Sequence, residues 1–273
     1  MVFDKARFIT KALAVVGPYL GRAAIRRVAA YGHSWTWRNT PDAKSIIVLG
    51  GSFPGTELTL PTGYKVVWIE KHSHFNYIFN FPRYSVLKGH EQRAFIPYNF
   101  IAKGAPLDTL TRIQDEAIAM TDSQVLLASG ERIDYACLAF ATGSTQPLPA
   151  NLSCNKRSEA CRELQGKQQT IEKSRRIAVV GGGAVGVQLA SDIKDFFTTK
   201  EVTLVHSRGQ LLNRFGSRLQ DYVLTTLRDE LKVRVLLNER LKLPTGGNFT
   251  RSTCLTFSDG SKKKFDLVVS LSF

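Results

Sequence analysis

Three glycines at positions 181, 183 and 186 have the type and spacing that bind a phosphate group. In the pattern G-x-G-x-x-G the first glycine permits a tight turn and the second lets the backbone approach a pyrophosphate, while the third lets helix and strand pack closely. The N–H groups at the start of the following helix donate to the phosphate, and the helix dipole also favours its charge. Gly181, Gly183 and Gly186 therefore predict a nucleotide site.

A second version of this pattern lies earlier in the chain. Gly50, Ser52 and Gly55 occupy its three places, and Gly51 stands between the first two. Serine is small enough for the second place, so we expect this turn also to offer its N–H groups to a pyrophosphate.

The connection after this first turn is short. Residues 50–64 give 15 positions between the strands, whereas residues 181–200 give 20 in the later copy. The helix after Gly55 is therefore expected to have about two turns, roughly 10 Å of rise. We expect it to hold a nucleotide less firmly than the later copy does.

The residue that follows the second strand of each copy determines whether the site favours a ribose with a free 2′-hydroxyl or one with a 2′-phosphate. Glu70 is placed to accept a hydrogen bond from an adenosine ribose, and an ordinary strand-end carboxylate is the alternative. The later copy has no acidic residue there and reads His206-Ser207-Arg208. A basic pair suits a 2′-phosphate and favours NADPH over NADH, whereas exposed loop residues without a ligand are the alternative.

An internal repeat supplies the elements that must position these residues. SIIVLGGSFPG (45–55) corresponds to RIAVVGGGAVG (176–186), an apolar strand followed by a glycine turn in each copy. KVVWIE (65–70) corresponds to EVTLVH (201–206), a second apolar strand. The repeat predicts an α/β fold with tandem Rossmann-like dinucleotide-binding domains.

The ends of the two copies match as well. Residues 124–143 and 254–273 each contain a hairpin around a glycine, followed by an apolar strand. We therefore expect a basic extension at 1–44, a first nucleotide-binding domain at 45–170 and a second at 171–273.

Positive charge is concentrated at the N-terminal end. The net charge is +14, and residues 1–44 hold eight Lys or Arg against two acidic residues. Their apolar stretch, residues 8–20, contains Lys11 and is too short to span a bilayer. This composition is typical of a transit peptide or of a helix on a membrane surface, and an exposed extension without a partner is the alternative. We expect an intracellular protein of the cytoplasm or mitochondrion, with membrane contact through residues 1–44; no motif indicates nucleic-acid binding.

The four cysteines show neither a C-x-x-C pair nor the spacing of a zinc site. A reduced intracellular protein without a metal is therefore favoured, and the dithiol of a disulfide reductase is excluded.

Taken together, these motifs resemble the FAD-dependent pyridine nucleotide oxidoreductases. Within them the chain is most similar to the apoptosis-inducing-factor-like group that includes the ferroptosis suppressor proteins, especially fungal members. The resemblance is carried by VLGGSFPG, WIEKHSHFNYIFNFPR, FATG, IAVVGGGAVGVQLASDI and TLVHSRGQLL. It implies FAD in the first domain, NAD(P)H in the second, and hydride transfer from nicotinamide to flavin, with electrons passed on to a quinone or oxygen.

The same resemblance places further residues near the flavin. Lys71, Pro82 and Arg83 would lie on the flavin side of the cleft, and Thr142 and Gly143 would approach the cofactor where the chain passes between domains. The flavin carries the chemistry, so we name no catalytic residue.

Two departures bear on the activity. The first crossover is short, and the family continues beyond the position of Phe273 to complete its FAD domain and to add a C-terminal domain. We therefore expect a shortened enzyme of weak or absent activity, with a catalytically inactive NAD(P)H-binding protein as the alternative.

Overall fold

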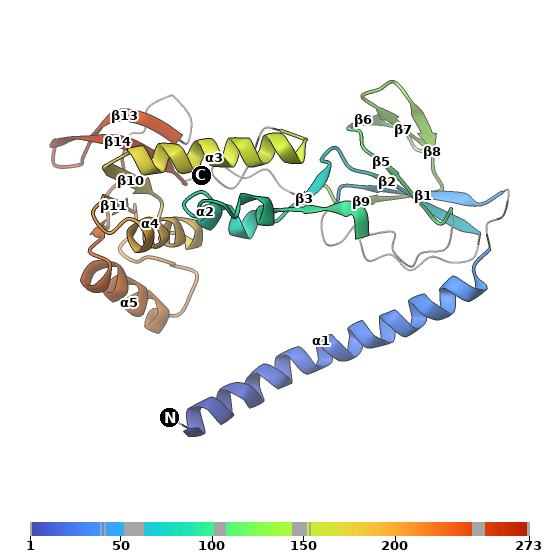
Figure 1. Ribbon diagram of the computed structural model, residues 1–273, viewed down its shortest axis with the longest axis horizontal. Coiled ribbons are helices and arrows are strands. Elements are labelled where there is room, and N and C mark those ends of the chain that lie inside the picture. Colours follow the sequence, from blue (N-terminus) through green and yellow to red (C-terminus); the bar gives the residue numbers. More distant parts are fainter. Residues whose placement is uncertain are drawn as a thin grey trace. The chain divides into compact units, whose positions relative to one another are not determined.

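The computed structural model describes residues 2–38, 40, 42–51, 63–100, 108–143, 152, 154–241 and 249–271. Contacts divide the chain into two units: Met1–Lys71 with Tyr98–Gly143, and His72–Pro97 with Ser144–Phe273 (Figure 1). The predicted boundary between residues 170 and 171 does not coincide with a division between these units, and the predicted domains stay a prediction.

The first unit contains a parallel sheet of four strands in the order β5-β2-β1-β9. The two central strands bury apolar side chains on both faces, Ile47 to Leu49 in β1 and Val66 to Ile69 in β2, whereas the outer strands β5 and β9 are half-buried or exposed. A separate antiparallel sheet of three strands, β6-β7-β8, packs Val125 and Leu127 into the same core as Ile47 and Ile69. The bounds are β1 Lys44–Leu49, β2 Tyr64–Ile69, β5 Leu110–Ile113, β6 Ala117–Met120, β7 Gln124–Leu127, β8 Arg132–Asp134 and β9 Cys137–Phe140.

A long helix, α1 (Val2–Thr36), precedes this sheet. The helix is followed by a buried tryptophan, Trp37, whose Nε1 donates to the carbonyl of Tyr64 at 3.3 Å. The Arg38 guanidinium donates to the carbonyls of Trp35 and Trp37, each at 2.9 Å, which satisfies acceptors that a helix end leaves open. Among the described residues, no helix combines the length and the apolar character needed to cross a bilayer.

The second unit contains a five-stranded sheet in the order β12-β11-β10-β14-β13, parallel except for β13. Helix α4 buries Leu189 and Ile193, four residues apart on one face, against Ile177 and Val179 of β10. The bounds are α3 Arg157–Lys173, β10 Arg176–Val180, α4 Ala184–Phe196, β11 Glu201–Val205, α5 Ser217–Thr225 with the π-helical turn η5 Thr226–Glu230, β12 Arg234–Leu236, β13 Phe249–Thr256 and β14 Lys262–Ser270.

Residues 72–97 lie between strands of the first unit in sequence but pack within the second unit. Strand β3 (His74–Asn76) pairs antiparallel with β4 (Phe95–Pro97), and the short helix α2 (Phe81–Tyr84) lies between them in sequence. Phe81 and Phe95 form a cluster with Leu164 of α3. This cluster explains why the segment belongs to the second unit.

The internal repeat is visible in the strand registers. Strand β1 pairs in parallel with β2 and β9, and β10 pairs in parallel with β11 and β14. Leu49 faces Phe140 in the first copy, and Val180 faces Ser270 in the second. The predicted α/β fold with two Rossmann-like cores is therefore confirmed. One detail differs: β14 is a single nine-residue strand, whereas its counterpart is divided into β8 and β9.

Candidate functional site

The second glycine turn requires glycine at its first and third places. Gly181 follows β10 with φ of +121°, and its N–H donates to the carbonyl of Val205 at 2.8 Å. A Cβ on Gly186 would lie 1.8 Å from the carbonyl oxygen of Gly181, and a Cβ on Gly181 would lie 3.1 Å from the carbonyl carbon of Leu271. Turn, helix and strand β14 are thus in direct backbone contact, which is the role predicted for these two glycines.

Gly183 has a different environment. It is the N-cap of α4 with φ of −78°, a value open to any residue, and no heavy atom of the described residues lies within 4 Å of a Cβ placed on it. The first N–H groups of an α-helix have no partner within the helix. Open space beside Gly183, at the start of α4, leaves room there for the phosphates of a dinucleotide.

His206 follows β11 and contacts the same turn. The N–H of Gly182 donates to His206 Nδ1 at 3.1 Å. Nε2 is buried and has no hydrogen-bond partner in the part of the chain that the structure describes. Burial lowers the pKa of His206 from its ordinary value, and the nearby charge of exposed Arg208 lowers it further, so the imidazole is neutral at pH 7.

The first turn brings together several of its predicted residues. Gly50 has φ of +99°, and its N–H donates to the carbonyl of Ile69 at 2.8 Å. A Cβ on Gly50 would lie 2.3 Å from the carbonyl oxygen of Ala141 and 2.9 Å from the Cα of Thr142. Gly143 follows with φ of +71° and open space beside it within the described residues. This segment therefore lies against the glycine turn, and the contact of Thr142 and Gly143 with a cofactor stays a prediction.

Side chains also hold the first turn. The N–H of Gly51 donates to the Glu70 carboxylate, the Trp68 Nε1 donates to the carbonyl of Gly50 at 3.0 Å, and the Tyr98 hydroxyl donates to the carbonyl of Gly51 at 3.1 Å. A Cβ on Gly51 would lie 2.2 Å from the Tyr98 hydroxyl oxygen, so this position also requires glycine.

The two aromatic residues that contact this turn, Trp68 and Tyr98, were not predicted from the sequence. Burial raises the pKa of Tyr98, and the charge of Glu70 raises it further, so the phenol stays protonated. The Arg112 guanidinium lies over both rings, 4.8 Å from the Tyr98 centroid and 5.6 Å from that of Trp68. Trp68 lies in the motif WIEK next to Glu70, so its contact with the turn could have been predicted from the sequence. No motif near Tyr98 indicates its contact with Gly51.

The described N–H groups of the first turn bond within the unit rather than facing a phosphate. Those of Gly50 and Gly51 donate to Ile69 and Glu70. Phosphate donors would have to come from residue 52 onward. Ser52, Gly55 and the predicted short helix lie outside the described residues.

Three residues predicted near the flavin have other partners. Lys71 in the first unit pairs with Glu116 at 3.2 Å, and both side chains are exposed. In the second unit, Pro82 is buried in the first turn of α2, and Arg83 pairs with the buried Asp192 of α4 at 3.1 Å. The contact of these three residues with flavin stays a prediction.

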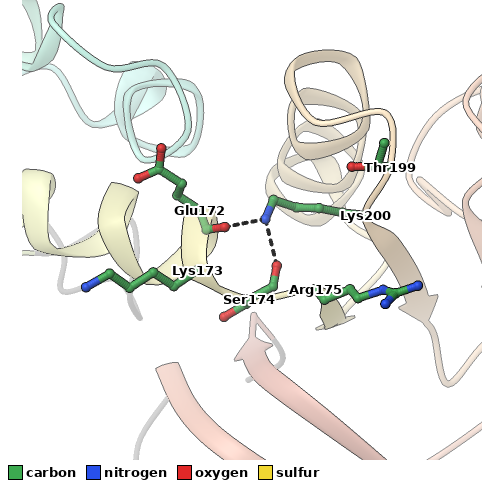
Figure 2. A pocket seen from close by; sticks show the side chains of 6 residues that line it. All are labelled: Glu172, Lys173, Ser174, Arg175, Thr199 and Lys200. Carbon is green, nitrogen blue, oxygen red and sulfur yellow. Dashed lines mark hydrogen bonds between the residues drawn. The ribbon is translucent and has the colours of Figure 1, made fainter.

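A pocket of about 320 Å³ lies at the N-terminal ends of strands β10 and β11 in the second sheet (Figure 2). Its lining residues precede β10 and β11, whereas the glycine turn and His206 follow these strands. Lys200 Nζ donates to the carbonyls of Glu172 and Ser174 at 2.6 and 2.7 Å. The lysine thus satisfies carbonyls at the end of α3, a structural role that does not require a ligand. The lining residues are Glu172, Lys173, Ser174, Arg175, Thr199 and Lys200.

The cysteines form no reactive pair. All four lie in the described residues and are free thiols. Burial raises the pKa of Cys154 to about 11, and its thiol donates to the Glu163 carboxylate at 3.5 Å. In the described residues no cluster of His, Cys, Asp or Glu has the make-up of a metal site.

Comparison with known proteins agrees with this geometry. The family described as pyridine nucleotide-disulphide oxidoreductase matches residues 44–271. The chain is 36% identical over 230 residues to Fe-regulated protein 8 of Mycosarcoma maydis, covering 74% of this chain and 57% of that one. It is 32% identical over 214 residues to ferroptosis suppressor protein 1 of Mus musculus, covering 73% and 53%. The predicted resemblance is confirmed, and the chain spans about half the length of these relatives.

Solved structures share the fold. A ferredoxin reductase from Rhodopseudomonas palustris superposes with a TM-score of 0.59 at 20% identity, over 83% of this chain and 58% of that one. NDH2 from Plasmodium falciparum, solved in complex with NADH, gives a TM-score of 0.61 at 16% identity, over 85% and 55%.

Proposed function

Because the chain belongs to the pyridine nucleotide-disulphide oxidoreductase family, a family of FAD- and NAD(P)H-dependent enzymes, we propose that it oxidises NAD(P)H through a bound FAD. This proposal rests on the pair of parallel-sheet cores. In each core a backbone N–H of the glycine turn donates a hydrogen bond to the side chain of the residue after the second strand. The electron acceptor under this proposal is a quinone or oxygen, because the free cysteines offer no dithiol to accept electrons.

The second unit would hold the nicotinamide nucleotide. A Cβ placed on Gly183 would meet open space at the start of α4, where a dinucleotide's phosphates would bind, and His206 follows the strand at whose end the adenosine ribose of a dinucleotide binds. The first unit would hold FAD through Gly50, Gly51, Glu70 and the Thr142 segment. Bound flavin supplies the hydride chemistry, while this chain binds and orients the two nucleotides.

The visible absorption spectrum of the purified chain tests this function. With FAD added and free FAD removed, flavin bands that bleach on anaerobic addition of NADPH, and return with a quinone or with oxygen, are the expected result. A colourless protein that remains colourless after incubation with FAD would contradict the proposal. Gly50→Ala is the matched variant, because its Cβ would meet Ala141 in the first unit and leave the second unit intact.

A catalytically inactive NAD(P)H-binding protein is the second candidate function. The observation that favours it is the shorter connection after the first turn, residues 50–64 against residues 181–200. The N–H groups of Gly50 and Gly51 are engaged within the protein as those of Gly181 and Gly182 are, so the two described turns do not differ in this respect. NADPH binding without flavin bands and without NADPH oxidation would select this candidate.

The same proposal includes an intracellular place on an anionic membrane surface, reached through α1. Large apolar side chains recur on one side of this helix at spacings of three and four residues or their sums, and each is at least 45% exposed. The rings of Tyr31 and Trp35 lie 5.8 Å apart on this stripe, and exposed Arg22 lies on the opposite side by helical spacing. A helix with aromatic and aliphatic residues on one face and arginine on another binds at the lipid interface. The stripe is Leu13, Val16, Leu20, Val28, Tyr31 and Trp35.

Co-sedimentation with vesicles tests this contact. Binding to vesicles that contain phosphatidylserine should exceed binding to phosphatidylcholine alone, because the helix is basic. Leu20→Glu should reduce binding strongly, and the control Ala29→Glu, with the same charge change on the opposite side, should reduce it less. Equal loss in both variants would contradict burial of the stripe in lipid.

A further inference from the structure

Two carbonyl groups of the first glycine turn accept hydrogen bonds from buried aromatic side chains. The Gly50 carbonyl accepts from Trp68 Nε1 at 3.0 Å, and the Gly51 carbonyl accepts from the Tyr98 hydroxyl at 3.1 Å. The two rings meet edge to face with centroids 4.6 Å apart, and Trp68 and Tyr98 are only 2% and 6% exposed. Burial raises the pKa of Tyr98, so its hydroxyl keeps the proton that it donates.

The equivalent carbonyls of the second turn are held by the main chain instead. The repeat aligns the two turns residue by residue. In the second turn the Gly182 carbonyl accepts from the backbone N–H of Leu212 at 2.9 Å. The Gly181 carbonyl oxygen lies against Gly186 of α4, where a Cβ would be only 1.8 Å from it. Aromatic side chains therefore do in the first turn what backbone groups do in the second.

Trp68 also lies on the sheet face that a helix covers in the second unit. Neighbouring side chains along a strand point to opposite faces, and Val67 packs into the cluster with strand β7, so Trp68 lies on the other face. The residue aligned with Trp68 is Leu204, which shares a cluster with Leu189 of α4. The connection after the first turn is shorter, 15 positions against 20. Tyr98 thus packs against Trp68 on the face where the shorter connection has fewer residues to offer.

The direction of these carbonyls matters for an anion. In a planar trans peptide unit, the carbonyl of one residue and the N–H of the next point in opposite directions. A carbonyl oxygen repels a phosphate, whereas successive backbone N–H groups attract it. A donor that holds the Gly51 carbonyl inside the protein therefore also sets the direction of the next N–H along the chain.

We propose that Tyr98, supported by Trp68, is a positioning residue for FAD: its hydroxyl holds the Gly51 carbonyl inward and directs the N–H of residue 52 toward the FAD pyrophosphate. This inference rests on the proposed binding of FAD in the first unit. Without the hydroxyl the buried carbonyl lacks its donor, so the turn loses the conformation that binds. The Kd for FAD should then rise roughly 5- to 150-fold, the range that an unsatisfied buried carbonyl gives.

The test is an FAD titration of the full chain, followed by flavin fluorescence, for the wild type and two variants. Tyr98→Phe keeps the ring and removes only the hydroxyl. Tyr135→Phe is the matched control, because it removes a hydroxyl that donates to the Thr121 carbonyl at 2.6 Å in the same unit. Tyr135 packs with Ile47, on the face of the sheet opposite to Trp68. The control should keep the wild-type Kd for FAD, and all three forms should bind NADPH equally.

Thermal unfolding of the same samples separates positioning from stability. Both variants lose one hydroxyl-to-carbonyl hydrogen bond, so both should unfold at a somewhat lower temperature, while only Tyr98→Phe weakens FAD binding. An unchanged Kd for FAD in Tyr98→Phe, or an equal rise in both variants, overturns the inference and leaves FAD binding in place. Failure of the wild type to bind FAD overturns the proposed function itself, and this inference with it.

Proton NMR of the wild-type chain, with carbon-labelled tyrosine rings for assignment, gives a readout that does not depend on a variant folding. A buried hydroxyl that is bonded to a carbonyl exchanges slowly with water, so the Tyr98 hydroxyl proton should give a separate signal. This signal should persist when FAD is bound. Its loss on addition of FAD would show that the bound turn does not use the hydroxyl and would overturn the inference.

Discussion

Gly183→Val separates nucleotide binding from folding in the second unit. Gly183 has φ of −78°, and no heavy atom of the described residues lies within 4 Å of a Cβ placed there. Valine is less favourable than glycine as an N-cap, so we expect a loss of about 0.5–1 kcal/mol in the free energy of unfolding. The neighbouring Gly186→Ala would instead put a Cβ 1.8 Å from the carbonyl oxygen of Gly181 and should prevent folding of this unit.

Binding should change far more than stability. The valine methyl groups would occupy the space in front of the α4 N–H groups, where a pyrophosphate is expected. Loss of one charge-assisted hydrogen bond costs about 1.5–3 kcal/mol, so the Kd for NADPH should rise roughly 10- to 150-fold.

NADPH titration by calorimetry and thermal unfolding of the same samples measure the two effects. Gly183→Ser is the control, because serine is a good N-cap and Ser52 occupies the same place in the first turn. It should fold and bind within a few-fold of wild type. Wild-type affinity in Gly183→Val, or an unfolded protein, would refute the reasoning.

Three further changes test stability at defined contacts. Gly50→Ala, with φ of +99° and its Cβ 2.3 Å from the Ala141 carbonyl oxygen, should cost at least about 2 kcal/mol in urea unfolding. The pKa of Asp266 lies below its ordinary value because the backbone N–H of Arg176, at 2.8 Å, and that of the preceding residue donate to it. Its carboxylate therefore stabilises the fold above about pH 4 and loses this contribution as pH falls through the folded-state pKa. Asp266→Asn should cost about 1 kcal/mol at pH 7 and much less at pH 2 in the same assay. Lys200→Met should lower the free energy of unfolding by about 1–2 kcal/mol and leave the NADPH Kd unchanged.

The sequence predicts the strands and the turns well because their signals are local. The runs IIVL, VVWI and IAVV have the continuous apolar character of parallel strands buried on both faces, and all three form such strands. The repeat also places Glu70 and His206 in equivalent positions, because strand pairing in a common register fixes where each strand ends.

Other parts of the structure depend on contacts that no local pattern reveals. Residues 72–97 belong to the second unit because Phe81 and Phe95 pack against Leu164, at least 69 positions away in the chain. Tyr98 reaches Gly51 across 47 positions. The predicted roles of Lys71 and Arg83 came from the family resemblance, and their observed partners, Glu116 and Asp192, lie 45 and 109 positions away in the chain.

The passage of residues 72–97 into the second unit makes the polypeptide hard to dissect. Because the chain changes unit at 71/72, 97/98 and 143/144, neither unit is a continuous stretch of the gene. Expression of residues 171–273 alone would remove α2 and all but the last three residues of α3, and it would expose Asp192 without its arginine. A minimal nucleotide-binding fragment must therefore be built by fusing residues 72–97 to residues 144–273, and protease nicks at the crossings should leave the two pieces of each unit associated.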